Sequence, residues 1–171
     1  PPSHLLVTLR FGDEEHPITL QLGGASPERL ARAASIAVEE YGYDEINLNC
    51  GCPSARVVSK QKDADKCLGA SLMRDPELVG ECLRRMKEAV GDVPVTVKHR
   101  LGVRKSERSP DDSQDCYEFI SDFVDLVHDR SGVDHFVVHA RAAVLGGLSA
   151  AANRVVPPLR YDEVHRLADD F

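Results

Sequence analysis

The stretch NLNCGCPS (47–54) places two cysteines, Cys50 and Cys52, one residue apart directly after an apolar run. A thiol at the end of a strand can ligate a metal, form a disulfide, or act as a nucleophile or general acid. Gly51 tolerates unusual backbone angles, and Pro53 restricts the residue before it to extended conformations. We therefore expect the Cys52 thiol to be held in a defined place, whereas Cys50 could pack beneath the loop.

The cysteine pattern argues against a metal and against a disulfide framework. Structural zinc sites usually show two C-x(2–4)-C pairs, whereas C-x-C occurs once here and the other cysteines are scattered. The five cysteines are an odd number, which favours a reducing compartment, the cytoplasm ahead of an organelle. Cys82 lies on the apolar stripe of an expected helix, so we assign it to the core. No metal site is predicted.

Polar side chains stand at the ends of four short apolar runs, namely Gln21, Asn49, Lys98 and His139. In parallel α/β folds, ligands meet the carboxyl ends of the strands, so these four groups should point at one rim. A lysine at the end of a buried strand needs an anion or a polar ring beside it, unless it reaches out to solvent. Lys98, Gln21 and His139, the last followed by Arg141, together predict a site for a polar, planar, anionic cofactor.

Strands and amphipathic helices must alternate to position these groups. Strands are expected at 16–22, 44–49, 93–100 and 134–141. Helices are expected to begin at Pro27 with Ser26 as N-cap, at Asp75-Pro76, near Tyr117 and near Tyr161. The segment 102–115 reads as a polar loop.

This alternation predicts an α/β fold with a parallel sheet. The strands are apolar until their last residue or two, which is typical of strands buried on both faces. About four βα units fit a partial TIM (β/α)8 barrel, and an open four-stranded sheet is the alternative. No G-x-G-x-x-G follows the first strand, which disfavours a dinucleotide-binding Rossmann fold.

Bulk composition fits a globular chain of 171 residues with 42% hydrophobic residues and a net charge of −7. No apolar run approaches the roughly 18 residues of a membrane span. The acidic total argues against nucleic acid, but basic residues gather in two segments that could meet RNA phosphates. These residues are Lys98, His99, Arg100, Arg104, Lys105 and Arg108, then Arg141, Arg154, Arg160, His165 and Arg166.

Six blocks, in this order, resemble the tRNA-dihydrouridine synthase family. They are HPITLQLGG, YGYDEINLNCGCPS, GASLMRDPELV, VPVTVKHRLGV, FVVHARAAVLGGLS and NRVVPPLRYDEVHRLADDF. The likeness runs from about His16 and is closest to the subgroup that acts on uridine 20 and its neighbour. It implies an FMN-binding TIM barrel, of which residues 1–171 would form roughly strands three to six, without the family's helical tRNA-binding domain.

The resemblance also implies roles for individual residues. Cys52 matches the proton donor to C5 of the uracil, and Cys50 is then a bystander. The other matched positions are Asn49 for the uracil, Gln21, Lys98 and His139 for FMN, Arg141 near flavin and substrate, and Asn153 and Arg154 for tRNA.

The implied activity is reduction of the C5–C6 double bond of a D-loop uridine in tRNA, with NADPH reducing the FMN. Two alternatives remain: another FMN barrel acting on a free pyrimidine, like dihydroorotate dehydrogenase, or a non-catalytic RNA-binding remnant. We expect a monomer when full length. The 171-residue chain alone is expected to fold poorly and to be inactive, because half a barrel leaves two open sheet edges. Residues 59–66 form an insertion relative to the family pattern.

Overall fold

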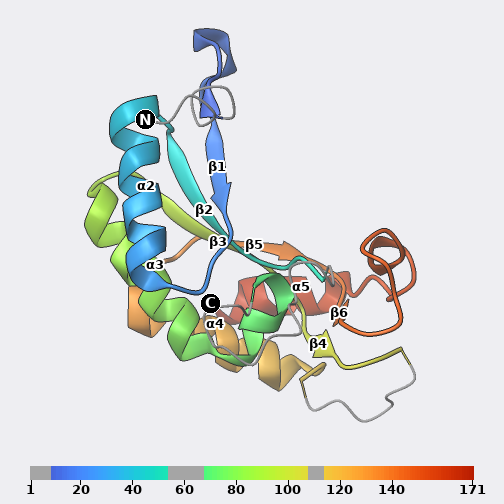
Figure 1. The fold of residues 1–171 in the computed structure, drawn as a ribbon. Coiled ribbons are helices and arrows are strands. Elements are labelled where there is room, and N and C mark those ends of the chain that lie inside the picture. The colour runs from blue at the N-terminus through green and yellow to red at the C-terminus, as the bar shows by residue number, and fades with distance from the viewer. Residues whose placement is uncertain (1–8, 54–67, 108–113) are drawn as a thin grey trace.

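The computed structural model describes residues 9–53, 68–107 and 114–171, so the insertion at 59–66 lies outside the described residues. The main sheet contains, in spatial order, β1 (Thr19–Leu22), β2 (Glu45–Cys50), β3 (Val95–Arg100) and β5 (Phe136–His139), all parallel (Figure 1). The spatial order of the strands is also their order along the chain. Each crossover therefore advances one strand in the same direction, which is the winding of a (β/α) barrel and not of a doubly wound sheet.

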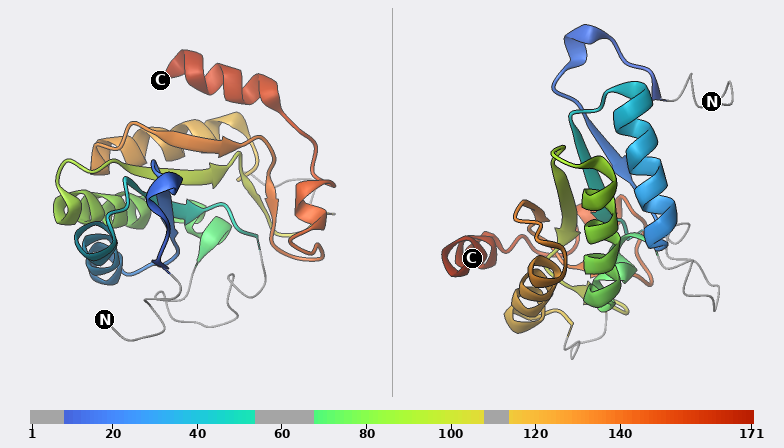
Figure 2. Two further views of the ribbon diagram at one scale, coloured as in Figure 1. Left: turned by 90° about the horizontal axis from the view of Figure 1, so that it is seen from above. Right: turned by 90° about the vertical axis from the view of Figure 1, so that its left-hand side faces the viewer.

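Three helices lie side by side along one face of this sheet (Figure 2). They are α2 (Pro27–Tyr41), α3 (Pro76–Val90) and α4 (Tyr117–Ser131), and α5 (Tyr161–Asp170) follows β5. Uniform right-handed crossovers put every helix on the same side of the sheet. The core between the two layers is largely aliphatic, and Ile46 and Leu48 of β2 belong to the same buried cluster as Leu83 and Met86 of α3. Of the described sheet, β1 and β5 are the edge strands.

The helix starts confirm the sequence prediction. The Ser26 hydroxyl accepts a hydrogen bond from the backbone N–H of Arg29 at 3.5 Å, and Pro27 opens α2. A carboxylate oxygen of Asp75 accepts from the N–H of Leu78 at 3.1 Å at the start of α3. These caps satisfy backbone donors that the first helical turn leaves unpaired.

The two faces of the sheet differ in chemistry. Ile46 and Leu48 pair in register with Val95 and Val97, and these side chains face the helices. The alternate positions carry polar residues on the opposite, inner face, namely Gln21, Glu45, Asn47, Asn49, Thr96, Lys98, Arg100 and His139. The prediction that the strands are apolar until their last residues was therefore wrong, although most residues of β2 and β3 are buried on both faces.

A second, two-stranded parallel sheet pairs β4 (Val103–Arg104) with β6 (Ala143–Val144). Its first strand, β4, lies in the segment 102–115, which was predicted to be a loop throughout. Short 3-10 turns occur at η1 (Asp13–Glu15), η3 (Gly69–Arg74) and η4 (Ala152–Arg154). None of the helices in the described ranges has the length and apolar character needed to cross a membrane.

Candidate functional site

Hydrogen bonds hold the segment 51–53, directly after β2, on both sides. The side-chain oxygen of Asn49 accepts the backbone N–H groups of Gly51 at 3.0 Å and of Cys52 at 3.1 Å. The carbonyl of Cys52 accepts from the N–H of Ala70 in η3 at 2.9 Å. Asparagine favours such turns because its side chain can mimic a backbone acceptor. The partly exposed Cys52 is thereby fixed just beyond the end of β2.

The two neighbouring cysteines lie in different environments. Cys50 is the last residue of β2 and is fully buried in the core on the helix side. Burial raises the pKa of the Cys50 thiol well above its usual range. The expectation that Cys50 packs beneath the loop is confirmed, and of the two thiols only that of Cys52 is accessible at this end of the sheet.

The strand register brings the four predicted strand-end residues to one face. Gln21 pairs with Asn47, Asn49 pairs with Lys98, and His139 pairs with Arg100. Residues two apart on one strand share a face, so Gln21, Asn49, Lys98 and His139 all lie on the inner face. They occupy three successive levels, with Gln21 deepest and His139 nearest the carboxyl ends of the strands.

Arg100 joins three segments near these carboxyl ends. It is 3% exposed and donates to the carbonyls of Gly51 at 3.2 Å, Ala142 at 3.2 Å and Asn153 at 2.8 Å. Burial lowers the pKa of Arg100 to about 10, so the guanidinium stays charged near neutral pH. Its assignment to a phosphate-binding segment was wrong. Its position two residues after Lys98 was the signal that could have placed it on the inner face.

His139 stands in a field of positive charge. Burial lowers its pKa to about 4, and the neighbouring cations Arg100, Lys98 and Arg141 contribute to the same shift. The imidazole is therefore neutral near pH 7. An anionic ligand placed among these cations would be stabilised by all of them.

The loops after β5 form a hollow of about 380 Å³ at the carboxyl end of that strand. Its lining includes His139, Arg141 and Arg154, together with Leu159 and Tyr161. The Arg141 guanidinium donates to the carbonyl of Val155 at 3.3 Å and to that of Pro157. Arg154 in η4 is exposed. The structure thus brings together three of the predicted site residues, His139, Arg141 and Arg154. Arg141 also stabilises the loop that follows it.

Asn153, predicted to contact tRNA, is buried within the protein. Its side chain is fully buried and bonds to Val144 of β6 twice, accepting the N–H at 2.8 Å and donating to the carbonyl at 2.9 Å. It also donates to the carbonyl of Ser149 at 3.3 Å. The amide is buried and bonded to these backbone groups, so in this structure the side chain supports the loop that presents Arg154. Its contact with tRNA stays a prediction.

Most members of the two basic segments that the structure describes are bound within the protein. His99 is fully buried beside the rings of Phe123 and Phe136. Arg160 pairs with Asp115 at 2.6 Å. Arg166 lies 3.6 Å from the centre of the Tyr117 ring. Arg108 lies outside the described ranges. Lys98 lies on the inner face, and Arg141 and Arg154 line the hollow at its mouth.

Polar residues that the sequence analysis overlooked form a chain of hydrogen bonds deeper on the inner face. Gln21 Nε2 donates to Asn47 Oδ1 at 2.7 Å, and Asn47 Nδ2 donates to the Thr96 hydroxyl at 2.8 Å. The Thr96 hydroxyl donates to a carboxylate oxygen of Glu45 at 2.8 Å. The polar residues at alternate positions, 45, 47 and 49 and then 96, 98 and 100, were the signal for this row.

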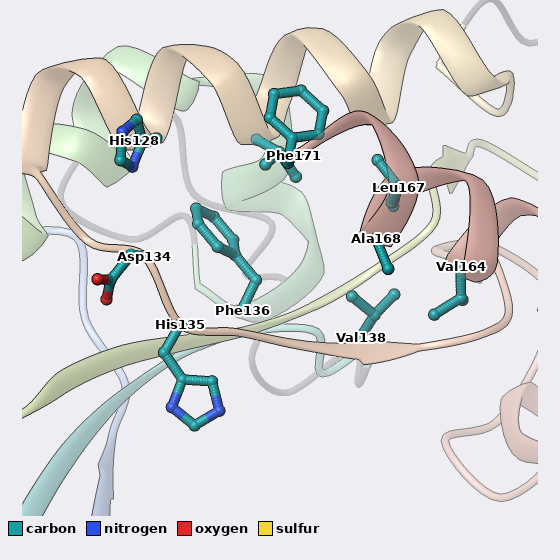
Figure 3. Close-up of a pocket in the computed structure, with 10 residues that line it drawn as sticks. His128, Asp134, His135, Phe136, Val138, Val164, Leu167, Ala168 and Phe171 are labelled. Atoms are coloured by element: carbon teal, nitrogen blue, oxygen red, sulfur yellow. The ribbon is translucent and has the colours of Figure 1, made fainter.

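Another hollow of about 380 Å³ lies on the opposite side of the sheet, between α4, β5 and α5. Phe136 and Val138 of β5 point toward Leu167 and Phe171 there (Figure 3). Its largely apolar lining belongs to the helix layer and faces away from the polar inner row. Within the described ranges, no group of three His, Cys, Asp or Glu side chains is arranged to hold a metal ion.

Comparisons with known proteins all point to the same family. The family described as dihydrouridine synthase (Dus) matches residues 4–171. Relatives named tRNA-dihydrouridine(20/20a) synthase are 50% identical in Vibrio parahaemolyticus and 49% in Shewanella oneidensis, each over 163 residues. These matches cover 95% of this chain and 45% and 44% of the respective relatives. The Escherichia coli relative of the same name is 45% identical, with 95% and 44% covered. The chain therefore spans about half the length of these relatives.

Proposed function

Since the chain belongs to the dihydrouridine synthase family, we propose that it acts within an enzyme that reduces the C5–C6 double bond of uridine in the D-loop of tRNA. By its likeness to the 20/20a relatives, the target is uridine 20 and its neighbour. Residues 1–171 would form roughly strands three to six of the barrel. One observation carries the proposal: Gln21, Asn49, Lys98 and His139 share the inner face directly below the fixed loop of Cys52.

The inner face suits FMN. Burial and then the cations Arg100, Lys98 and Arg141 lower the pKa of His139. An anionic group placed among these cations would relieve their mutual repulsion. Gln21, Lys98 and His139 would hold the cofactor. When bound and reduced by NADPH, FMN supplies a hydride to C6 of the uracil, and the protein supplies placement and electrostatics.

Cys52 supplies the proton. Hydride addition at C6 leaves electron density at C5, and the thiol of Cys52 gives its proton to that carbon as a general acid. Asn49 holds the thiol in place, because its oxygen is occupied by the backbone of the Cys52 loop. The amide NH₂ of Asn49 is the group left for the base, so it donates to a uracil carbonyl.

A uridine inside folded tRNA must leave its stack to reach this face. The exposed Arg154 and the nearby Arg141 place positive charge at the mouth, where phosphates of the extruded strand would pass. This local charge is compatible with the net charge of −7, because about half of the acidic residues lie on the helices α2, α3, α4 and α5. The free thiols of Cys50, Cys52 and Cys82 suit a reducing compartment such as the cytoplasm.

The test uses protein expressed from the complete gene. We expect it to purify with visible flavin absorbance and to introduce dihydrouridine into tRNA lacking the modification when NADPH is supplied. Flavin-containing protein that reduces free pyrimidines but leaves tRNA unchanged would favour the free-pyrimidine alternative. Colourless protein that binds tRNA would favour a non-catalytic RNA-binding role.

A further inference from the structure

We propose that Glu45, acting through Thr96 and Asn47, determines which end of the Gln21 amide faces the cofactor. The three are positioning residues, and the inference rests on the proposed function because it concerns how the flavin is held. The hydrogen bonds Gln21–Asn47, Asn47–Thr96 and Thr96–Glu45 are 2.7, 2.8 and 2.8 Å long. Asn47 is 4% and Thr96 1% exposed, so water does not compete for the middle of this relay.

The chemistry of each group sets the direction of the relay. A carboxylate can only accept, so the Thr96 hydroxyl must give its single hydrogen to Glu45. The Thr96 oxygen can then only accept from Asn47, which turns the NH₂ of Asn47 toward it. The Asn47 oxygen consequently faces Gln21 and needs a donor. The Gln21 NH₂ is thereby fixed toward Asn47.

This direction follows from Glu45 and does not depend on how the two amides are assigned. If a group able to donate stood in place of the Glu45 carboxylate, every hydrogen bond of the relay could also run in the opposite direction. Because the relay ends on a carboxylate, only one order satisfies every member. The Gln21 carbonyl oxygen, an acceptor, is then the end of the amide that does not bond to Asn47.

The ligand group that meets the Gln21 oxygen must therefore be a hydrogen-bond donor. An imide N–H fits, and both the pyrimidine ring of a flavin and a uracil base carry one. Gln21 lies one level deeper on the inner face than Asn49 and Lys98, and hence farther from the loop of Cys52. Because tRNA approaches from the mouth, the deeper imide is that of the flavin. Holding the acceptor in place beforehand removes the cost of orienting it when the ligand binds.

Two matched pairs of variants test the relay. Thr96→Val removes the hydroxyl while keeping the side-chain shape, and Thr96→Ser keeps the hydroxyl. Glu45→Gln replaces the carboxylate by a group that can donate, and Glu40→Gln makes the same charge change on the exposed end of α2. The measurements are FMN affinity of the protein from the complete gene after flavin removal, and hydrogen exchange of the imide N–H in bound ¹⁵N-labelled FMN.

We expect T96V and E45Q to weaken FMN binding by about twofold or more, because at most about half of the molecules would then present the acceptor. The imide N–H should exchange faster in both. T96S and E40Q should match the wild type in both measurements. If T96V folds too poorly to measure, E45Q alone decides, because it preserves the shape of the buried side chains.

Three results would overturn the inference. One is wild-type affinity and exchange in T96V and E45Q. Another is an equal loss in T96V and T96S, which would indicate packing and not hydrogen-bond direction. The third is an imide N–H that responds to a bound uridine oligonucleotide instead of to these variants, which would assign Gln21 to the base. Failure of the wild type to bind FMN at all would instead reject the proposed function, and this inference with it.

Discussion

The side-chain oxygen of Asn49 lies 3.1 Å from the backbone nitrogen of Cys52 and accepts its hydrogen. The same oxygen accepts the N–H of Gly51 at 3.0 Å. One side chain on the inner face of β2 therefore shapes the loop that carries the reactive thiol. Its NH₂ group remains for a ligand, which divides the functions of Asn49 between its two ends.

The two functions of Asn49, holding the loop and binding a ligand, can be separated by mutation. Asn49→Asp keeps an oxygen for the loop but has no NH₂, so we expect nearly wild-type thermal stability and a raised KM for tRNA. Asn49→Ala removes both functions and should also lower the free energy of unfolding by about 1–2 kcal/mol. Thermal melts and steady-state kinetics on both variants measure the two effects. Equal melting temperatures for N49A and the wild type would contradict the loop-holding role.

The two cysteines provide an internal comparison for the proton donor. Cys52→Ala should lower uridine reduction by about a hundredfold or more, the usual contribution of a general acid, while FMN remains bound. Cys50→Ala should leave the rate nearly unchanged, because Cys50 is buried on the helix side. Dihydrouridine content of tRNA and flavin absorbance are the measurements. A similar loss of turnover in the two variants would mean that the wrong thiol was chosen.

Arg100 should stabilise the mouth of the sheet. Arg100→Lys keeps the charge but cannot reach three carbonyls at once, so at least one buried carbonyl loses its partner. We expect the free energy of unfolding to fall by about 1–3 kcal/mol. Arg154→Lys, at an exposed position, is the control and should change it little. Denaturant titration measures both, and an unchanged midpoint for R100K would disprove the bridging role.

Acid should destabilise the fold through His99. Burial lowers the His99 pKa from 6.5 to about 4, and its Nε2 has no partner among the described residues. Below pH 6.5 the imidazole is protonated in the unfolded chain but stays neutral in the folded chain. The contribution of His99 to stability is therefore fully present above about pH 6.5 and is lost as the pH falls to about 4. The loss is on the order of 3 kcal/mol.

The check is urea unfolding of wild type and His99→Leu at pH 7.5 and pH 4. His139, whose pKa is also lowered to about 4, remains in both proteins and contributes the same pH dependence to each. The variant should therefore lose less stability on acidification than the wild type. Identical losses in the two proteins would show that His99 is not the group responsible.

Alanine substitutions at Arg154 and at its neighbour Asn153 should have different effects, the first on tRNA binding and the second on stability. Arg154→Ala should weaken tRNA binding and reduce the slope of log affinity against log salt by about 1, as expected for one lost phosphate contact. Asn153→Ala should lower stability, because Val144 loses both of its bonds to that side chain. Binding titrations at several salt concentrations and thermal melts compare the two. An unchanged salt slope in R154A would remove it from the RNA contacts.

Local sequence signals determined the elements of this protein. Ser26-Pro27 and Asp75-Pro76 predicted two helix starts correctly, because a capping side chain and a proline act within one turn of the chain. Apolar runs with polar ends predicted the four main strands to within a few residues. The parallel α/β order followed from their alternation with helices, and so did the shared edge of Gln21, Asn49, Lys98 and His139.

Tertiary structure alone decided what the other polar residues do. Arg100 and Asn153 were expected to meet RNA, yet both are buried against backbone carbonyls from other segments. The relay from Glu45 to Gln21 depends on β1, β2 and β3 pairing in one register, and a shift of one residue would turn its members to the helix side. Periodicity and capping report on neighbours along the chain. Hydrogen-bond partners many residues apart in sequence are determined by how the strands align in space.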